Sequence, residues 1–199
     1  MSLKDSYESY RKNGIFFVIT GPSGVGKTTI MDHTLESDER LAYSISHTTR
    51  DRRPEEVDGE DYYFVDREEF EGFRKEDRFL EWAEIYGDYY GTSREEIDRI
   101  KREGRDPFLD IDVQGAAQLR ADPSVNPVFV FLAPPSLEEL ERRIDNRGAE
   151  SPEVKEKRMG VAREELSRIP EFDYLIVNEK LKRAVEELEA VIKAERLKV

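Results

Sequence analysis

The chain has 199 residues, which is the length of one domain and is enough to bury a core. A net charge of −13 argues against general nucleic-acid binding, and the lack of cysteine excludes disulfides, thiol catalysis and zinc–thiolate sites. No apolar run approaches the roughly 18 residues of a membrane span, and residues 1–13 lack the pattern of a secretory signal. We therefore expect a cytoplasmic protein with neither a nucleic-acid nor a membrane partner.

The first predicted elements are a strand, a glycine-rich loop and a helix. Residues 15–19 are an apolar, β-branched and aromatic run typical of a buried strand, and a helix is expected from residue 28. The loop at 21–28 matches Gly-x4-Gly-Lys-[Ser/Thr]. This arrangement directs backbone N–H groups and the positive helix end at one point, which suits a phosphate. Phosphate binding is predicted for Gly21, Pro22, Ser23, Gly24, Val25, Gly26, Lys27, Thr28 and Thr29.

Two side chains of this loop have specific expected roles. Lys27 is expected to reach the β- and γ-phosphates of a nucleotide, and the hydroxyl of Thr28 is expected to bind Mg²⁺.

A cluster of arginines follows a short predicted strand at residues 43–45. Arg50, Arg52 and Arg53 occur within four residues of an otherwise acidic chain. The planar guanidinium group suits phosphate, so the cluster indicates an anion site. A solvated loop with scattered charge is the alternative interpretation.

Short elements with many aromatic residues come next. The patterns predict a strand at residues 62–65 and then a helix that Asp66 caps and that runs to about residue 75. A second strand is predicted at residues 79–85 and a turn at residues 87–91. These elements interrupt the alternation of strands and helices. We therefore expect residues 46–91 to form an inserted lobe.

Regular alternation resumes after residue 92. Ser93 is expected to cap a helix that ends near Gly104. Helices between strands imply a parallel sheet that is covered on both faces. Further strands are predicted at residues 108–113, 127–132 and 174–177, and further helices at residues 137–146, 152–169 and 180–197, with a short one that ends near residue 120.

Six motifs in one order carry a family resemblance over residues 14–192. The chain resembles the guanylate kinases, P-loop enzymes that transfer a phosphoryl group from ATP to GMP. The motifs are Gly-Pro-Ser-Gly-Val-Gly-Lys at 21–27, Ser-Ile-Ser-His-Thr-Thr-Arg at 44–50, Glu-Val-Asp-Gly-Glu-Asp-Tyr at 56–62, Phe-Leu-Glu-Trp-Ala-Glu at 79–84, Tyr-Tyr-Gly-Thr at 89–92 and Asp-Ile-Asp-Val-Gln-Gly-Ala at 110–116.

The resemblance implies a P-loop NTPase-type α/β fold in a single domain over residues 1–199. Its parallel sheet of five strands would be covered by helices on both faces. The core would comprise residues 14–45 and 92–199, the inserted mixed α/β lobe at 46–91 would bind GMP, and residues 146–163 would form a helical lid.

The resemblance also implies two groups of GMP contacts. Guanine offers N1–H and N2–H₂ as a donor pair to a carboxylate, which adenine does not. For Glu81 the alternative is an outward-facing strand residue, and buried tyrosines are more often core than ligand contacts. The implied contacts are Ser46, Arg50, Arg53, Tyr62 and Tyr90 for the phosphate, and Glu81, Thr92 and Asp112 for the base.

On the ATP side, the resemblance implies lid arginines, an adenine neighbour and a metal site. Arg143, Arg147 and Arg158 match the lid arginines, although ordinary surface charge is the alternative for Arg143. Asn178 falls near the expected adenine position. Asp110, at the end of a strand, is expected to face Mg²⁺ together with Thr28. The expected catalytic residues are Lys27, Arg50, Arg147 and Arg158.

Four positions depart from the pattern of the family. Thr28 replaces a usual Gly or Ser but keeps the hydroxyl, so we expect activity to survive. Glu55 replaces a usual Gly, Pro107 opens a strand that normally begins with an aliphatic residue, and Ala149 stands where Thr or Gln is common. These three are expected to affect local detail of the loop, the strand and the lid.

Three other functions compete with this interpretation. Related domains of scaffold proteins bind phosphopeptides without catalysis, but they tend to lose the loop lysine or the lobe serine, and this chain keeps Lys27 and Ser46. A GTPase switch would explain Asp-x-x-Gly at 112–115, yet the guanine-reading Asn-Lys-x-Asp is absent. A kinase for another nucleoside monophosphate is the third alternative. The oligomeric state stays open, and a homodimer is compatible with the sequence.

Overall fold

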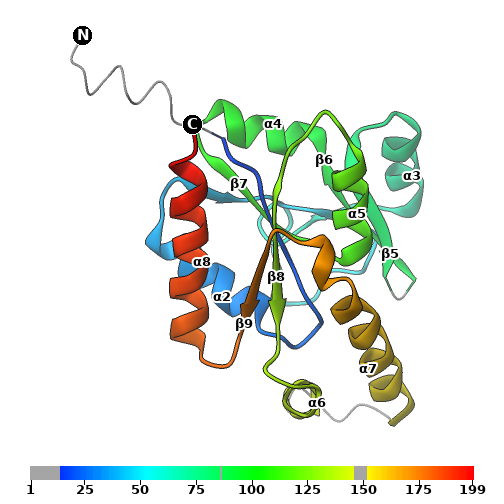
Figure 1. The fold of residues 1–199 in the computed structure, drawn as a ribbon. Coiled ribbons are helices and arrows are strands. Elements are labelled where there is room, and N and C mark those ends of the chain that lie inside the picture. The colour runs from blue at the N-terminus through cyan, green and yellow to red at the C-terminus, as the bar shows by residue number, and fades with distance from the viewer. Residues whose placement is uncertain (1–13, 86, 146–151) are drawn as a thin grey trace, which may run out of the picture.

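A five-stranded parallel sheet lies at the centre of the structure, a computed structural model that describes residues 14–85, 87–145 and 152–199 (Figure 1). Its strands are β1 (Phe17–Thr20), β2 (Leu41–Tyr43), β7 (Asp106–Asp110), β8 (Val128–Ala133) and β9 (Tyr174–Val177). They are ordered β2–β7–β1–β8–β9, and every neighbouring pair is parallel. The predicted five-stranded parallel sheet is therefore confirmed.

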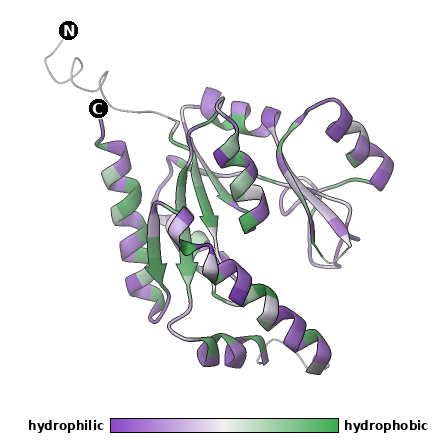
Figure 2. Ribbon diagram, turned by 45° about the vertical axis from the view of Figure 1, so that its right-hand side comes forward, coloured by the Kyte–Doolittle hydropathy of each residue, from purple (hydrophilic) through white to green (hydrophobic). Residues whose placement is uncertain are grey.

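Helices cover both faces of this sheet. They are α2 (Lys27–Ser37), α4 (Arg94–Arg102), α5 (Val113–Ala121) and α8 (Leu181–Arg196). Because successive strand side chains point to opposite faces, Phe17 and Ile19 pack in one apolar cluster with residues of α2 and α8. Phe16 and Val18 pack in a second cluster with residues of α4 and α5. Figure 2 shows apolar strands between helices with hydrophilic outer faces, and none of the described helices could cross a membrane.

A second sheet is formed by β3 (His47–Thr48), β4 (Tyr63–Phe64), β5 (Phe79–Ile85) and β6 (Asp88–Ser93). Its order is β4–β3–β6–β5, with β3 and β4 parallel and the other two pairs antiparallel. Helix α3 (Arg67–Lys75) packs on it through Phe70, whose ring centroid lies 4.5 Å from that of Phe79 and 5.3 Å from that of Tyr89. As predicted, Asp66 is the N-cap of α3, and its carboxylate accepts a hydrogen bond from the backbone N–H of Glu69.

Element boundaries differ from the prediction at several strands, and β2 lies at Leu41–Tyr43 rather than at residues 43–45. The predicted turn at residues 87–91 is wrong, because β6 begins at Asp88 and only Gly87, with φ of 96°, has turn geometry there among the described residues. Tyr89 and Tyr90 favour a strand and pair with β5. Strand β7 ends at Asp110 rather than at residue 113, because the following residues begin α5.

Helices α6 (Leu137–Asp145) and α7 (Pro152–Ser167) form a separate layer beyond the sheet, followed by the 3₁₀ turn η1 (Ile169–Glu171) (Figure 1). Leu140 and Ile144 of α6 pack against Met159 and Ala162 of α7 in an apolar cluster of their own. Lys155 of α7 adds ion pairs of 2.8–2.9 Å to acidic side chains of α6. Residues 146–151 of the predicted lid, which include Ala149, lie outside the described residues.

A buried carboxylate joins the beginnings of two central strands to the last helix. Asp106 is fully buried at the start of β7. It accepts a hydrogen bond from the backbone N–H of Ile15 at 2.9 Å and one from Nε of Arg196 at 2.7 Å. Arg196 also bonds to Asp38, after α2. This polar contact lies at the opposite end of β7 from Asp110.

Candidate active site

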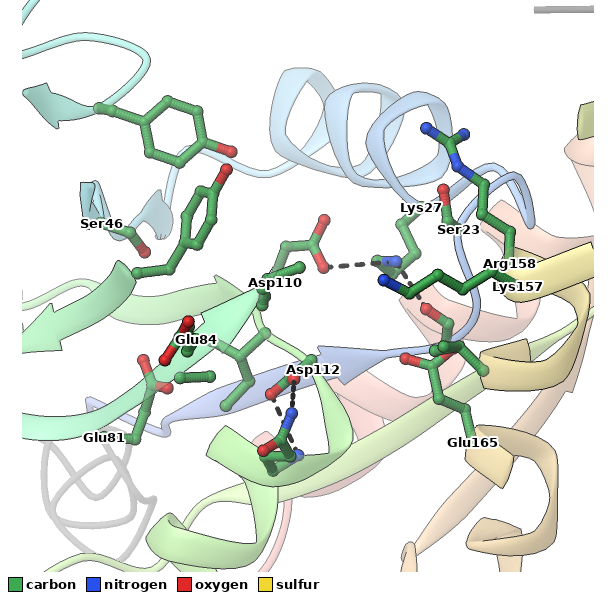
Figure 3. Close-up of a pocket in the computed structure, with 18 of the residues that line it drawn as sticks. Ser23, Lys27, Ser46, Glu81, Glu84, Asp110, Asp112, Lys157, Arg158 and Glu165 are labelled. Atoms are coloured by element: carbon green, nitrogen blue, oxygen red, sulfur yellow. Dashed lines mark hydrogen bonds and ion pairs between the residues drawn. The ribbon is translucent and has the colours of Figure 1, made fainter. Parts of the chain in front are cut away.

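A cleft of about 450 Å³ opens between the carboxyl end of the parallel sheet, the second sheet and α7. Figure 3 shows charged side chains that point into it from these elements. From the core and its loops the lining residues are Gly21, Ser23, Lys27, Tyr43, Asp110, Ile111, Asp112 and Gln114. From the second sheet and its surroundings they are Ser46, Tyr62, Glu81, Ala83, Glu84, Ile85 and Tyr90, and from α7 they are Lys157, Arg158, Val161 and Glu165.

At two positions of the glycine-rich loop, the surrounding atoms leave room only for glycine. A Cβ atom on Gly21 would lie 2.2 Å from the backbone oxygen of Leu132 in β8. A Cβ atom on Gly26, where φ is 97°, would lie 2.7 Å from Nδ2 of Asn178. The loop therefore runs close to β8 and to the residue after β9, and it delivers Lys27 to the first turn of α2.

Lys27 faces the cleft beside a carboxylate. Its Nζ donates to the backbone oxygen of Gly21 at 2.6 Å and lies 3.7 Å from Oδ1 of Asp110. Burial raises the pKa of Asp110, while Lys27 opposes that rise. A phosphate that enters here would meet an ammonium group, and a cation would meet the carboxylate.

The residues at this end fit a magnesium ion held mainly by its nucleotide. Asp110 supplies a carboxylate, and Thr28 supplies an exposed hydroxyl in the first turn of α2. No group of three or more His, Cys, Asp or Glu side chains gathers as a metal cage in the described part of the chain. Mg²⁺ commonly takes one or two protein oxygens and completes its shell with phosphates and water.

Two predicted ATP contacts support the loop from behind. Nδ2 of Asn178 donates to the backbone oxygen of Val25 at 2.7 Å, and Nη1 of Arg143 donates to the same oxygen at 3.3 Å. Glu139 holds Arg143 in turn, with Oε1 at 2.8 Å from Nε. Neither Asn178 nor Arg143 lines the cleft. Their observed contacts position the loop, a role that sequence reasoning did not identify.

The far end of the cleft carries hydroxyl groups and aromatic rings of the second sheet and its neighbouring loops. Ser46, Tyr62 and Tyr90 line it, and the two tyrosine rings meet edge to face with centroids 5.9 Å apart. The guanidinium carbon of Arg50 lies 5.5 Å from the centroid of the Tyr62 ring. The structure therefore brings these four predicted side chains close to one another.

Glu56 ties the two predicted phosphate arginines together. Its Oε1 lies 2.7 Å from Nη2 of Arg50, and its Oε2 accepts from the backbone N–H of Arg53 at 2.9 Å. The hydrogen bond from Arg50 lowers the pKa of Glu56. Arg50 is mostly covered, whereas 64% of the Arg53 side chain is exposed, and neither lines the cleft. Sequence reasoning missed Glu56, although an acid within an arginine cluster is a usable signal.

Glu81 is a buried acid without a cationic partner among the described residues. Only 4% of it is exposed, and burial raises its pKa to about 7, with Asp112 acting in the same direction and Thr92 against it. Thr92 pairs with Glu81 across β5 and β6. The buried Thr92 hydroxyl has no partner in strict hydrogen-bond geometry within the described ranges. Glu81 thus has Thr92 beside it but no cation to balance its charge within the described ranges, which a ligand with hydrogen-bond donors would offset.

Asp112 combines two roles at the start of α5. It lines the cleft, and its Oδ1 caps the helix by accepting from the backbone N–H groups of Gln114 at 3.0 Å and Gly115 at 2.8 Å. Oδ2 accepts from Nε2 of Gln114 at 3.0 Å. The expected base contact is therefore also the N-cap of α5.

Helix α7 contributes one predicted residue and three unpredicted ones, of which Val161 is apolar. Arg158 lines the cleft as expected, and so do Lys157 and Glu165 (Figure 3). Burial raises the pKa of Glu165 to about 7, although Lys27 opposes this. Positions 157, 161 and 165 repeat every four residues and share one helix face, which could have indicated them. Arg147 lies outside the described residues.

The parallel sheet, the phosphate loop and a cleft with two polar ends define a P-loop nucleotide kinase. A sequence model described as guanylate kinase matches residues 14–195. The chain therefore belongs to the guanylate kinase family.

Individual relatives agree with this family. The guanylate kinase of Nitrosospira multiformis is 49% identical over 93% of this chain and 88% of its own, and that of Oceanobacillus iheyensis is 46% identical over 94% and 91%. The crystal structure of guanylate kinase from Anaplasma phagocytophilum matches with a TM-score of 0.78 and 33% identity, over 95% of this chain and 89% of that one.

Proposed function

We propose that this chain carries out the reaction of its family, in which the γ-phosphoryl group of ATP passes to GMP to give ADP and GDP. The observation that carries this proposal is that one cleft has Lys27 and Asp110 at one end and Ser46, Tyr62 and Glu81 at the other. Each end suits one phosphorylated ligand. The protein is thus an ATP:GMP phosphotransferase whose two ligands face each other.

At the ATP end, the backbone N–H groups of the loop and the ammonium group of Lys27 would hold the phosphates. Asp110 and Thr28 would hold Mg²⁺, which neutralises phosphate charge when it is bound. Arg158, and Arg147 by the family resemblance, would add positive charge from the lid. Asn178 and Arg143 would act through the loop that they support.

At the GMP end, the base and the phosphate would be bound by different groups. Glu81 would accept from N1–H and N2–H₂ of guanine, with Thr92 and Asp112 beside it. Ser46, Arg50, Arg53, Tyr62 and Tyr90 would bind the phosphate. Since Glu56 already pairs with Arg50, the phosphate would have to share or replace that partner.

The reaction asks little covalent chemistry of the protein. The attacking oxygen belongs to an anionic phosphate, so no general base is required. Lys27 and the lid arginines would stabilise charge on the transferred group, and the two ends of the cleft would hold donor and acceptor in line. Two segments would close over the cleft, namely the lobe of residues 46–91 and the lid of residues 146–163. Their closure would exclude water, which otherwise accepts the phosphoryl group.

A coupled kinase assay with ATP and Mg²⁺ tests the proposal by comparing GMP, AMP, UMP and CMP as acceptors. We expect kcat/KM for GMP to exceed the others by at least about 10²-fold, because unpaired buried polar groups reject the wrong base. Lys27→Ala should lower kcat about 10²- to 10³-fold, whereas Lys182→Ala, at an exposed position, should not. Phosphopeptide binding without ADP formation would favour the scaffold-type module, and GTP hydrolysis without an acceptor would favour a GTPase.

The cytoplasmic location, the lack of nucleic-acid and membrane partners and a homodimer stay predictions. Analytical ultracentrifugation at several protein concentrations would test the homodimer.

A further inference from the structure

Helix α5 contains a glycine at the point where it meets the buried acid of β5. Gly115 is buried in the first turn of α5, and its φ is not in the left-handed region. Glycine forms helices less well than alanine, so the backbone gives no reason for glycine here. The reason must lie in what surrounds the missing side chain.

A methyl group at this position would collide with Glu81. A Cβ atom built on Gly115 would lie 2.3 Å from Oε2 and 3.0 Å from Cδ of Glu81. Such separations require one group to move. Glu81 is almost completely covered and it lines the cleft, so the cleft is the open space into which its carboxylate would shift.

We propose that Gly115 is a positioning residue for acceptor selection, because the space left by its missing side chain sets where the Glu81 carboxylate lies. This inference rests on the proposed contact between Glu81 and guanine. A carboxylate that accepts from N1–H and N2–H₂ together must present both oxygens in the plane of the base. A displacement toward the cleft reduces the room for the base and breaks that alignment.

Gly115→Ala tests this inference in steady-state kinetics. We expect KM for GMP to rise about tenfold or more with an unchanged KM for ATP, since small displacements of a binding group are costly. The preference for GMP over inosine monophosphate, which keeps N1–H but lacks the 2-amino group, should fall. Gly72→Ala is the matched control, because Gly72 lies within helix α3 and an added Cβ there meets nothing within 4 Å. A rise in KM for ATP of the same size would indicate general damage to the fold and overturn the inference.

Two variants of the acid separate this inference from the proposed function. If Glu81→Gln leaves KM for GMP unchanged, the proposed base contact itself fails. If Glu81→Gln raises it but Gly115→Ala does not, only the role of Gly115 is overturned. Aspartate at position 81 is one methylene shorter and makes room for the methyl group, so Gly115→Ala should cost less in the Glu81→Asp background. Additive effects of the two substitutions on KM for GMP would overturn the inference as well.

Discussion

Asn178 and Arg143 meet behind the phosphate loop, where Nη2 of Arg143 donates to the backbone oxygen of Asn178 at 3.0 Å and both side chains donate to the carbonyl of Val25. The two residues come from the segment after β9 and from α6. Their meeting point joins three distant parts of the chain to one carbonyl group. The shape of the loop therefore depends on side chains that do not line the cleft.

This contact leads to a prediction for the loop. Asn178→Ala removes the 2.7 Å hydrogen bond and leaves the Val25 carbonyl with the longer one from Arg143. We expect a loss of about 1–3 kcal/mol in the free energy of unfolding and a several-fold higher KM for ATP, with KM for GMP unchanged. Asn126→Ala, at an exposed position, is the control. Equal changes in both KM values would contradict a role confined to the loop.

The arginine cluster gives a second prediction. Arg50 packs near Tyr62, whereas Arg52 beside it is exposed. Loss of a charged hydrogen bond costs about 1.5–3 kcal/mol, so Arg50→Ala should raise KM for GMP roughly 10- to 100-fold and leave KM for ATP unchanged. Arg52→Ala should change neither value appreciably. An unaltered GMP dependence in Arg50→Ala would refute the assignment of the phosphate site.

The buried acid predicts a pH dependence of stability. Burial raises the pKa of Glu81 from its ordinary value of 4.5 to about 7, so the folded state binds more protons than the unfolded state between these values. Stability should therefore fall as pH rises through this window. Glu81→Gln should be more stable than the parent by a few kcal/mol at pH 8, with the difference shrinking toward pH 4.5. Urea unfolding without nucleotides would measure this.

A control and a second measurement accompany that prediction. Glu95→Gln, at an exposed position of α4, should show no comparable gain at pH 8. Since guanine needs the carboxylate, KM for GMP in the parent should rise as pH falls below about 7. If Glu81→Gln lost stability at pH 8, the acid would already be paired in the free protein.

The contact between Asp106 and Arg196 predicts a change in stability without a change in chemistry. Asp106→Ala would leave the Ile15 N–H without its acceptor and remove one carboxylate from Arg196. We expect a loss of about 3–5 kcal/mol, the typical cost of breaking a buried pair. KM values of the folded fraction should stay the same, because Asp106 and Asp110 lie at opposite ends of β7. Asp106→Asn keeps an acceptor and should cost less.

Local pattern was enough for the parts of the fold that depend on neighbouring residues. Strand β1, the phosphate loop and the cap at Asp66 each follow from a few adjacent side chains. The prediction of a turn at residues 87–91 was wrong because Gly87 favours a turn, whereas the tyrosines that follow it favour a strand. The predicted end of β7 was wrong because Asp112 is compatible both with a strand and with the N-cap of a helix. Only the tertiary fold decides between these two roles.

The contacts that complete the site could not be inferred from pattern. Asn178 and Val25 lie 153 residues apart, and nothing local to Asn178 indicates a bond to a loop carbonyl. The close approach of Gly115 to Glu81 depends on how closely α5 packs against β5. The spacing of residues 157, 161 and 165 indicates a shared helix face, but only the packing of α7 brings that face, with Glu165, to the cleft. Such relations come from tertiary packing, which a single sequence does not display.

The order of the central strands has a consequence for synthesis of the chain. Strand β1 and its phosphate loop are made early, but their partners β7 and β8 come much later, and Ile15 and Asp106 are 91 residues apart. At roughly 5–20 residues per second, β1 waits on the ribosome for several seconds as an unpaired apolar segment. A nascent chain that stops before β8 lacks the strand against which the phosphate loop packs. The nucleotide-binding motif is thus synthesised early, but it is among the last parts of the fold to become functional.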